Sequence, residues 1–109
     1  MTVQQLQQTL GWTAFHMADP GRQVTGGYAG DLLSWVMGRA ERDCAWFTIM
    51  SNQNVAAVAL MADVACVVLT EGVVPDADLL RRAEEKEVNL LGTGEDTYTA
   101  ACRFRGCLE

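Results

Sequence analysis

The sequence predicts one α/β domain in which helices cover both faces of a mostly parallel sheet. In the second half of the chain, short apolar runs alternate with helical patterns, the order expected of consecutive strand–helix–strand units. These runs are apolar at every position, so the predicted strands are expected to be buried on both faces. With 109 residues the chain can bury one hydrophobic core but not two. We therefore expect a single three-layer domain over residues 1–109.

The first half of the chain predicts two helices and three extended segments. Thr2 can cap the first helix, whose apolar residues recur at helical spacing. The pair Gly26-Gly27 is expected to end an extended segment in a turn, and Asp31 stands at or near the N-cap of the second helix. The expected elements are a helix at 2–10, extended segments at 13–17, 23–25 and 46–50, and a helix that starts after Gly30.

The second half predicts alternating helices and strands. Residues 55–62 are apolar on nearly every side, which is typical of a helix buried on more than one face. Pro75 and Asp76 favour a helix start, because proline suits the first turn and an acid suits the positive end of the helix dipole. The expected elements are helices at 55–62, from 75 onward and at 96–102, and strands at 65–69 and 88–91. Right-handed crossovers would place the loops that follow the strands on one edge of the sheet.

The charge of the chain argues against nucleic-acid and membrane partners. The formal net charge is −6, and the eight Lys and Arg residues form no block larger than Arg81-Arg82. The N-terminal residues lack the basic region and long apolar run of a signal peptide. The most apolar stretch, residues 55–69, is interrupted by Asp63 and is too short to span a bilayer. We therefore expect a cytoplasmic protein.

The cysteine pattern does not predict a metal site. Cys44, Cys66, Cys102 and Cys107 form no C-x-x-C pair, and the one histidine, His16, is near none of them in sequence. We expect reduced thiols, no metal and no cofactor, because the cytosol keeps thiols reduced. Cys102 and Cys107 are the only pair worth testing for redox chemistry.

No catalytic constellation is visible in the sequence. The chain contains neither G-x-x-x-x-G-K-[ST] nor the dinucleotide-binding fingerprint, so its glycine turns do not specify a phosphate loop. Asp31 and Glu71 could act as an acid and a base, but no pattern in the sequence brings them together. We therefore expect no enzymatic activity.

Polar and glycine residues near the predicted strand ends are the candidate ligand contacts. In open α/β sheets, ligands usually bind at the carboxyl edge, where helix N-termini also offer free backbone N–H groups. Structural capping of the following helices is the alternative explanation for the same residue types. The candidate ligand-binding residues are Thr25, Gly26, Gly27, Asp31, Asn52, Asn54, Thr70 and Gly72.

Several segments resemble the DRTGG domain family. The segment GRQVTGG at residues 21–27 is similar to its short motif, and the segments GDLLSWVM and WFTIMSNQNVAAVALMADVACVVLTEG follow in the family's order. The resemblance covers about residues 6–103. It implies an α/β domain with a regulatory or ligand-sensing role, similar to the amino-terminal domain of HPr kinase/phosphorylase without the kinase domain. It implies no catalytic residues.

The sequence and the resemblance together favour a non-catalytic regulatory module. We expect it to bind a small ligand at the carboxyl edge of its sheet, with nucleotides as one candidate class. An interaction module that forms a homodimer or binds another protein is the alternative, with residues 55–62 and the tryptophans as the interface. A small redox protein that uses Cys102 and Cys107 is a third possibility.

Overall fold

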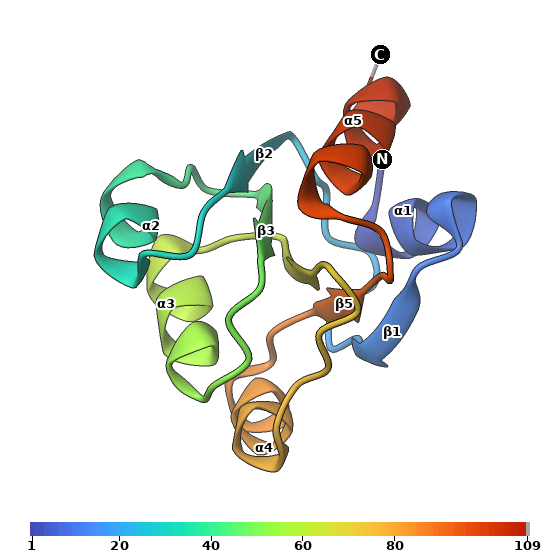
Figure 1. The fold of residues 1–109 in the computed structure, drawn as a ribbon. Coiled ribbons are helices and arrows are strands. Elements are labelled where there is room, and N and C mark those ends of the chain that lie inside the picture. Colours follow the sequence, from blue (N-terminus) through green and yellow to red (C-terminus); the bar gives the residue numbers. More distant parts are fainter. Residues whose placement is uncertain (109) are drawn as a thin grey trace.

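The computed structural model describes residues 1–108 and contains one five-stranded sheet between two layers of helices (Figure 1). Strands β2 to β5 are parallel, and β1 pairs antiparallel with β5. The order across the sheet is β1-β5-β4-β3-β2, so β1 and β2 are its edges. The predicted α/β fold with a mostly parallel sheet is confirmed. The strands are β1 (Thr13–His16), β2 (Gly26–Ala29), β3 (Cys44–Thr48), β4 (Cys66–Leu69) and β5 (Leu90–Gly92).

The helices divide between the two faces of the sheet according to their connections. Helices α2, α3 and α4 each lead from one strand to its neighbour, always in the same direction across the sheet. Right-handed crossovers of this kind place all three helices on one face, and α1 and α5 cover the other. Within residues 1–108 no helix has the length and apolar character needed to cross a bilayer. The helices are α1 (Val3–Leu10), α2 (Leu33–Arg39), α3 (Asn54–Ala62), α4 (Ala77–Lys86) and α5 (Thr97–Leu108).

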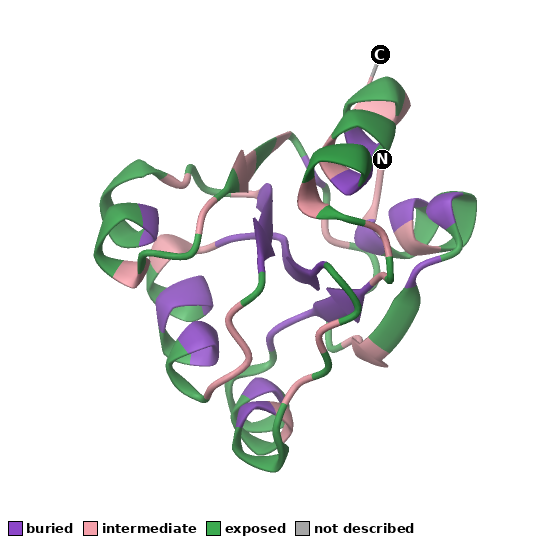
Figure 2. Cartoon of the chain, in the orientation of Figure 1, coloured by how far each residue is buried: buried purple, intermediate pink, exposed green. Residues whose placement is uncertain are grey.

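The central strands are buried on both faces (Figure 2). Trp46, Val67 and Leu90 belong to the core beneath α2, α3 and α4, whereas Phe47 and Leu91 belong to the core beneath α1 and α5. Successive residues of a strand point to opposite faces, so a continuous apolar run fills both cores at once. This explains why the predicted strands show no alternation of apolar and polar residues.

Three predicted helix caps are confirmed. Thr2 forms a capping box with Gln5: the Thr2 hydroxyl accepts from the Gln5 N–H, and the Gln5 side chain accepts from the Thr2 N–H. Asp76 accepts a backbone N–H in the first turn of α4, and Asp96 does the same in α5. Helix α5 continues to Leu108, beyond its predicted end at residue 102.

Two predictions near β2 are wrong. The pair Gly26-Gly27 forms no turn but lies inside β2, paired with the first residues of β3. Asp31 does not cap α2, because Leu32 occupies the N-cap position. The Asp31 carboxylate instead accepts from the Thr48 hydroxyl at 2.8 Å and the Ile49 N–H at 3.0 Å. A residue that precedes a helix can cap it or bind a neighbouring strand, and only the packing of the strands decides between the two.

Candidate functional site

The eight predicted ligand-binding residues lie at two opposite edges of the sheet. The Thr25 N–H donates to the Asp43 carbonyl at 3.0 Å, and Gly26 and Gly27 pair with Cys44 and the residue after it, at the start of β3. These three residues therefore lie at the amino edge, and the expectation that all eight line the carboxyl edge is wrong. The residues at the carboxyl edge are Asp31, Asn52, Asn54, Thr70 and Gly72.

The two asparagines at the carboxyl edge lie at the start of α3. The Asn52 side-chain carbonyl accepts from the Asn54 N–H at 2.9 Å, which closes the turn that leads into the helix. Asn54 is the first residue of α3, and its side chain is exposed. These contacts match structural capping of the following helix, which is the alternative to ligand binding at these residues. A role for them in ligand binding stays a prediction.

Thr70 and Gly72 follow β4 and contact the segment between β5 and α5. The buried Thr70 hydroxyl lies 2.6 Å from that of Thr97, and the Glu71 carboxylate accepts from the Thr97 N–H at 2.9 Å. The Gly72 N–H donates to the Thr93 carbonyl at 3.0 Å, and its φ of +75° suits glycine. Sequence reasoning missed Thr97, because a hydroxyl 27 residues away in the chain gives no local signal.

Glu95 is another carboxyl-edge residue that sequence reasoning missed. Its carboxylate accepts from Arg103 at 2.7 Å, from the Trp12 indole N–H at 2.8 Å and from the Thr93 hydroxyl at 3.1 Å. Arg103, followed by Trp12, lowers the pKa of Glu95 below its ordinary value of 4.5. The carboxylate thus connects the start of β1 to α5.

The loops after β2, β4 and β5 make the nearby part of the carboxyl edge poorly suited to an anionic ligand. Asp31, Glu71 and Glu95 place three carboxylates there, and each is already engaged in hydrogen bonds to the protein. Like charges at a binding site disfavour an anion. The cavity between β1 and the loops after β4 and β5 is only about 130 Å³ in volume. A cavity of about 330 Å³ lies farther along, beside Asn54 at the start of α3, and Arg82 and Lys86 of α4 also line it.

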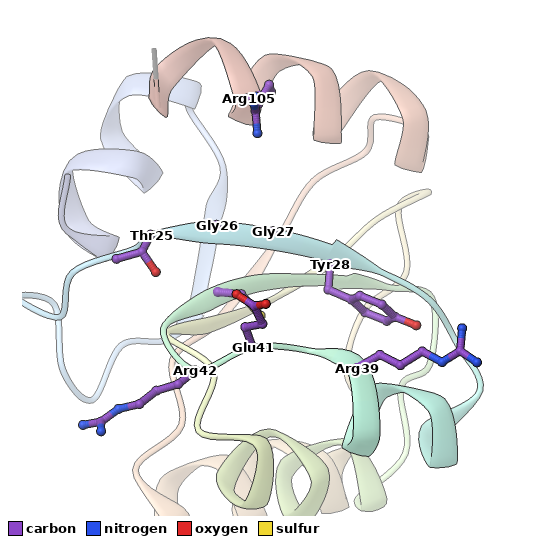
Figure 3. A pocket seen from close by; sticks show the side chains of 9 residues that line it. Thr25, Gly26, Gly27, Tyr28, Arg39, Glu41, Arg42 and Arg105 are labelled. Carbon is purple, nitrogen blue, oxygen red and sulfur yellow. The ribbon is translucent and has the colours of Figure 1, made fainter.

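Another cavity lies at the amino edge, beside the open edge of β2 (Figure 3). Its volume is about 330 Å³, within the range of small-molecule sites. Three of the eight basic residues of the chain line this cavity, against one acidic residue, although the net charge is −6. Basic residues therefore outnumber acidic ones in the lining of this cavity, and Arg42 among them is ion-paired with Asp63. Its polar side chains are those of Thr25, Tyr28, Arg39, Glu41, Arg42 and Arg105.

The arginines come from different elements and flank the cavity. The Arg39 guanidinium lies 3.8 Å from the centre of the Trp35 ring, and the Arg42 side chain pairs with Asp63 at 3.0 Å while remaining 77% exposed. Figure 3 shows Arg39 and Arg42 extending in opposite directions and Arg105 reaching from α5 toward β2.

The wall formed by β2 offers backbone groups to a ligand. Because the Thr25 N–H points to β3, the backbone of Gly26 points away from β3 in the parallel ladder. No other strand pairs with β2 on that side among the described residues. A backbone N–H group that no side chain covers can hydrogen-bond to an anion, and the outward-facing Gly26 provides one.

An ion-pair cluster holds the segment that leads into this cavity. The Arg22 guanidinium contacts Asp43 and Asp63, each at 2.8 Å. Burial would lower the pKa of Arg22, but the hydrogen bonds to Asp43 and Asp63 outweigh this effect and raise it. Both aspartates have positive φ, 65° and 57°. Arg22 therefore joins the chain before β2 to the start of β3 and the end of α3, and no sequence motif indicated this contact.

Many of the residues predicted to form an interface, residues 55–62 and the tryptophans, are buried in the structure. Helix α3 buries Val55, Ala56, Val58 and Ala59 in the core, whereas Ala57, Leu60 and Met61 are exposed. Trp12 and Trp46 are also buried, and among the tryptophans only Trp35 is exposed, at 52%. Its neighbours Leu32 and Met37 are exposed as well. Three of the eight exposed large apolar side chains of the described residues therefore lie on or next to α2.

The cysteines offer little support for the redox alternative. Burial raises the pKa of Cys44 to about 11 and that of Cys66 to about 12, so both are poor thiolates. Cys102 and Cys107 lie on the same helix, α5, five residues apart. At 3.6 residues per turn they point about 140° apart around the helix axis, so they cannot form a disulfide with each other.

The family of the chain follows from its sequence profile. The profile of the DRTGG domain matches residues 33–107. The chain belongs to the DRTGG domain family. The matched residues run from α2 to α5, so this DRTGG domain includes the three strand–helix units of the sheet. Residues 21–27 precede the match, and their equivalence with the short family motif stays a prediction.

A solved structure shares the fold of this DRTGG domain. It is the crystal structure of the CBS and DRTGG domains of the regulatory region of Clostridium perfringens pyrophosphatase, complexed with the activator diadenosine tetraphosphate. The TM-score is 0.74 at 14% sequence identity, over 94% of this chain and 45% of that chain. This chain thus spans less than half of the matched chain. Sequence comparison with curated proteins gives no significant match.

Proposed function

We propose that this DRTGG domain is a non-catalytic regulatory module that binds a small anion of the nucleotide class in the amino-edge cavity. Family membership and the shared fold with a regulatory region complexed with diadenosine tetraphosphate support a regulatory role. The observation that carries the ligand assignment is the grouping of three arginines around a cavity of about 330 Å³. Polyphosphates are anions that arginine recognises through charge-assisted hydrogen bonds.

The position of the ligand differs from the carboxyl edge that the sequence favoured. Three of the predicted ligand residues, Thr25, Gly26 and Gly27, line the amino-edge cavity. The carboxyl-edge residues are engaged in contacts that join loops and start helices. The carboxyl edge remains the second candidate place for a ligand, with Asn52 and Asn54 as its test residues.

The decisive experiment measures nucleotide and polyphosphate binding by isothermal titration calorimetry. We expect ATP or tripolyphosphate to bind the purified protein, and the double variant Arg39→Gln/Arg42→Gln to weaken that affinity at least tenfold. Arg81→Gln is the matched control, because Arg81 forms an exposed ion pair with Asp78 on α4, away from the cavity. Its affinity should equal that of the wild type.

Two results would contradict this assignment. The first is binding that is retained in Arg39→Gln/Arg42→Gln but lost in Asn52→Ala/Asn54→Ala. This result would indicate that the ligand binds at the carboxyl edge. Absence of binding by both ATP and tripolyphosphate would remove the anion-sensing function. Circular dichroism of each variant shows whether the fold is retained.

Self-association is the second candidate function. Leu32, Trp35 and Met37 are exposed by 59%, 52% and 37%, and all three lie on or next to α2. Adjacent exposed apolar side chains are typical of interaction surfaces. We propose α2 as the contact surface of a C2 homodimer, in place of α3, which buries Val55, Ala56, Val58 and Ala59 in the core.

A further inference from the structure

A second cavity lies on the other side of β2, between this strand and α5. Its volume is about 230 Å³, and its lining is mainly apolar, with contributions from Ala29, Phe47, Ala101, Phe104 and Leu108. The two cavities share Gly27, Tyr28 and Arg105 as lining residues. They therefore form neighbouring parts of one surface that passes over the edge strand.

The apolar cavity exists because β2 presents only small residues to α5. Side chains alternate along a strand, so Tyr28 packs into the core under α2 while Gly27 and Ala29 face α5. A Cβ atom at Gly27 would lie 2.9 Å from the Phe104 ring, which shows how closely that ring approaches the strand. Phe104 is fixed in turn by Phe47, with ring centroids 5.4 Å apart.

The two parts of the surface differ in their chemistry. The side toward α2 is lined by Arg39 and Arg42, whereas the side toward α5 offers methyl groups and aromatic carbon. Arg105 lines both cavities. A ligand that combines an anionic chain with one apolar ring system matches this division, because each part would meet a complementary surface.

We propose that the apolar cavity binds the base of a nucleotide whose phosphates lie along β2 in the amino-edge cavity. This inference rests on the proposed function and adds the position of the base. The methyl groups of Ala29 and Ala101 contact the base above the buried ring of Phe104. Gly26 lets the ligand cross the strand, because nothing lies within 4 Å of its Cβ position.

The test compares nucleoside triphosphates with tripolyphosphate, which lacks a base. We expect at least one of ATP, GTP, CTP and UTP to bind the wild-type protein at least tenfold more tightly than tripolyphosphate. Ala29→Leu places a larger side chain in the apolar cavity, so it should reduce that nucleotide affinity to the tripolyphosphate level. The tripolyphosphate affinity itself should change less than twofold. Ala14→Leu is the matched control, an exposed alanine on the opposite edge strand β1, and should behave as the wild type.

The outcomes separate this inference from the proposed function. Equal binding of tripolyphosphate and all four nucleotides would overturn the base position and leave the anion site standing. Undiminished nucleotide binding by Ala29→Leu would overturn it as well. Absence of binding by every probe would overturn both proposals together.

Discussion

Glu95 joins three parts of the molecule through a single carboxylate. It accepts hydrogen bonds from Trp12 at the start of β1, from Thr93 after β5 and from Arg103 in α5. Its side chain is only 22% exposed, so these contacts are partly shielded from water. Charge-assisted hydrogen bonds in such surroundings stabilise more than exposed ion pairs do.

Glu95→Gln should therefore destabilise the fold at neutral pH by about 1–2 kcal/mol. The lowered pKa means that the folded state favours the ionised form, so this stabilisation is complete above the ordinary value of 4.5. It is lost as the pH falls through the lower pKa of the folded state. Urea unfolding of the wild type and of Glu95→Gln at pH 7 and below pH 4 measures this. The difference between their free energies of unfolding should be smaller in acid.

Glu84→Gln is a suitable control for this charge change. Glu84 is exposed on α4 and should alter the free energy of unfolding by less than about 0.5 kcal/mol. A Glu95→Gln difference that stays constant with pH would show that the ionised carboxylate is not the stabilising group.

Three helices end in a residue with left-handed backbone conformation, but only one of these residues is glycine. Helix α1 ends at Gly11, whereas α3 and α4 end at Asp63 and Glu87, with φ of 57° and 56°. This conformation is unfavourable for residues with a Cβ atom. At Asp63 the carboxylate contacts Arg22 and Arg42, so the side chain has a compensating role.

Glu87→Gly should stabilise the protein by about 0.5–1 kcal/mol, because relief of backbone strain exceeds the added entropy of the unfolded chain. Asp63→Gly relieves the same strain but removes two ion-pair contacts. It should therefore leave the free energy of unfolding unchanged or lower it. Thermal unfolding of the two variants measures this contrast. Equal stabilisation by both would mean that the Asp63 carboxylate contributes nothing to the fold.

At the scale of the whole molecule, the two edges of the sheet differ in their surroundings. The β1 edge contacts α4, and the N-terminal helix α1 packs beside α5. The β2 edge borders the arginine-lined cavity, and α2 lies near this edge in Figure 1. The surface around β2 and α2 therefore combines a cavity with exposed apolar side chains.

Self-association through α2 predicts a concentration-dependent mass in solution. Sedimentation equilibrium should show a monomer–dimer equilibrium for the wild-type protein, and Leu32→Ser/Trp35→Ser should shift it to monomer. Leu60→Ser/Met61→Ser is the matched control, since both residues are exposed apolar side chains on α3. A strictly monomeric wild-type protein over a wide concentration range would remove this function.

Local patterns predicted most elements of the fold, because these elements depend on nearby residues. The apolar runs of β4 and β5 and the caps at Thr2 and Asp76 are recognisable without any tertiary contact. The predictions failed around β2, where Gly26-Gly27 extends along β3 instead of turning. Glycine permits both conformations, so pairing with β3 decides between them.

The sequence by itself determined the α/β class, the alternation of strands and helices, and the resemblance that the family profile confirms. These properties follow from periodicity and capping, which act over a few residues. Only the tertiary structure separated Thr25 from Thr70 at opposite edges and grouped Arg39, Arg42 and Arg105 around one cavity. These arginines come from α2, the loop after it and α5, and their proximity depends on the packing of both helical layers against β2.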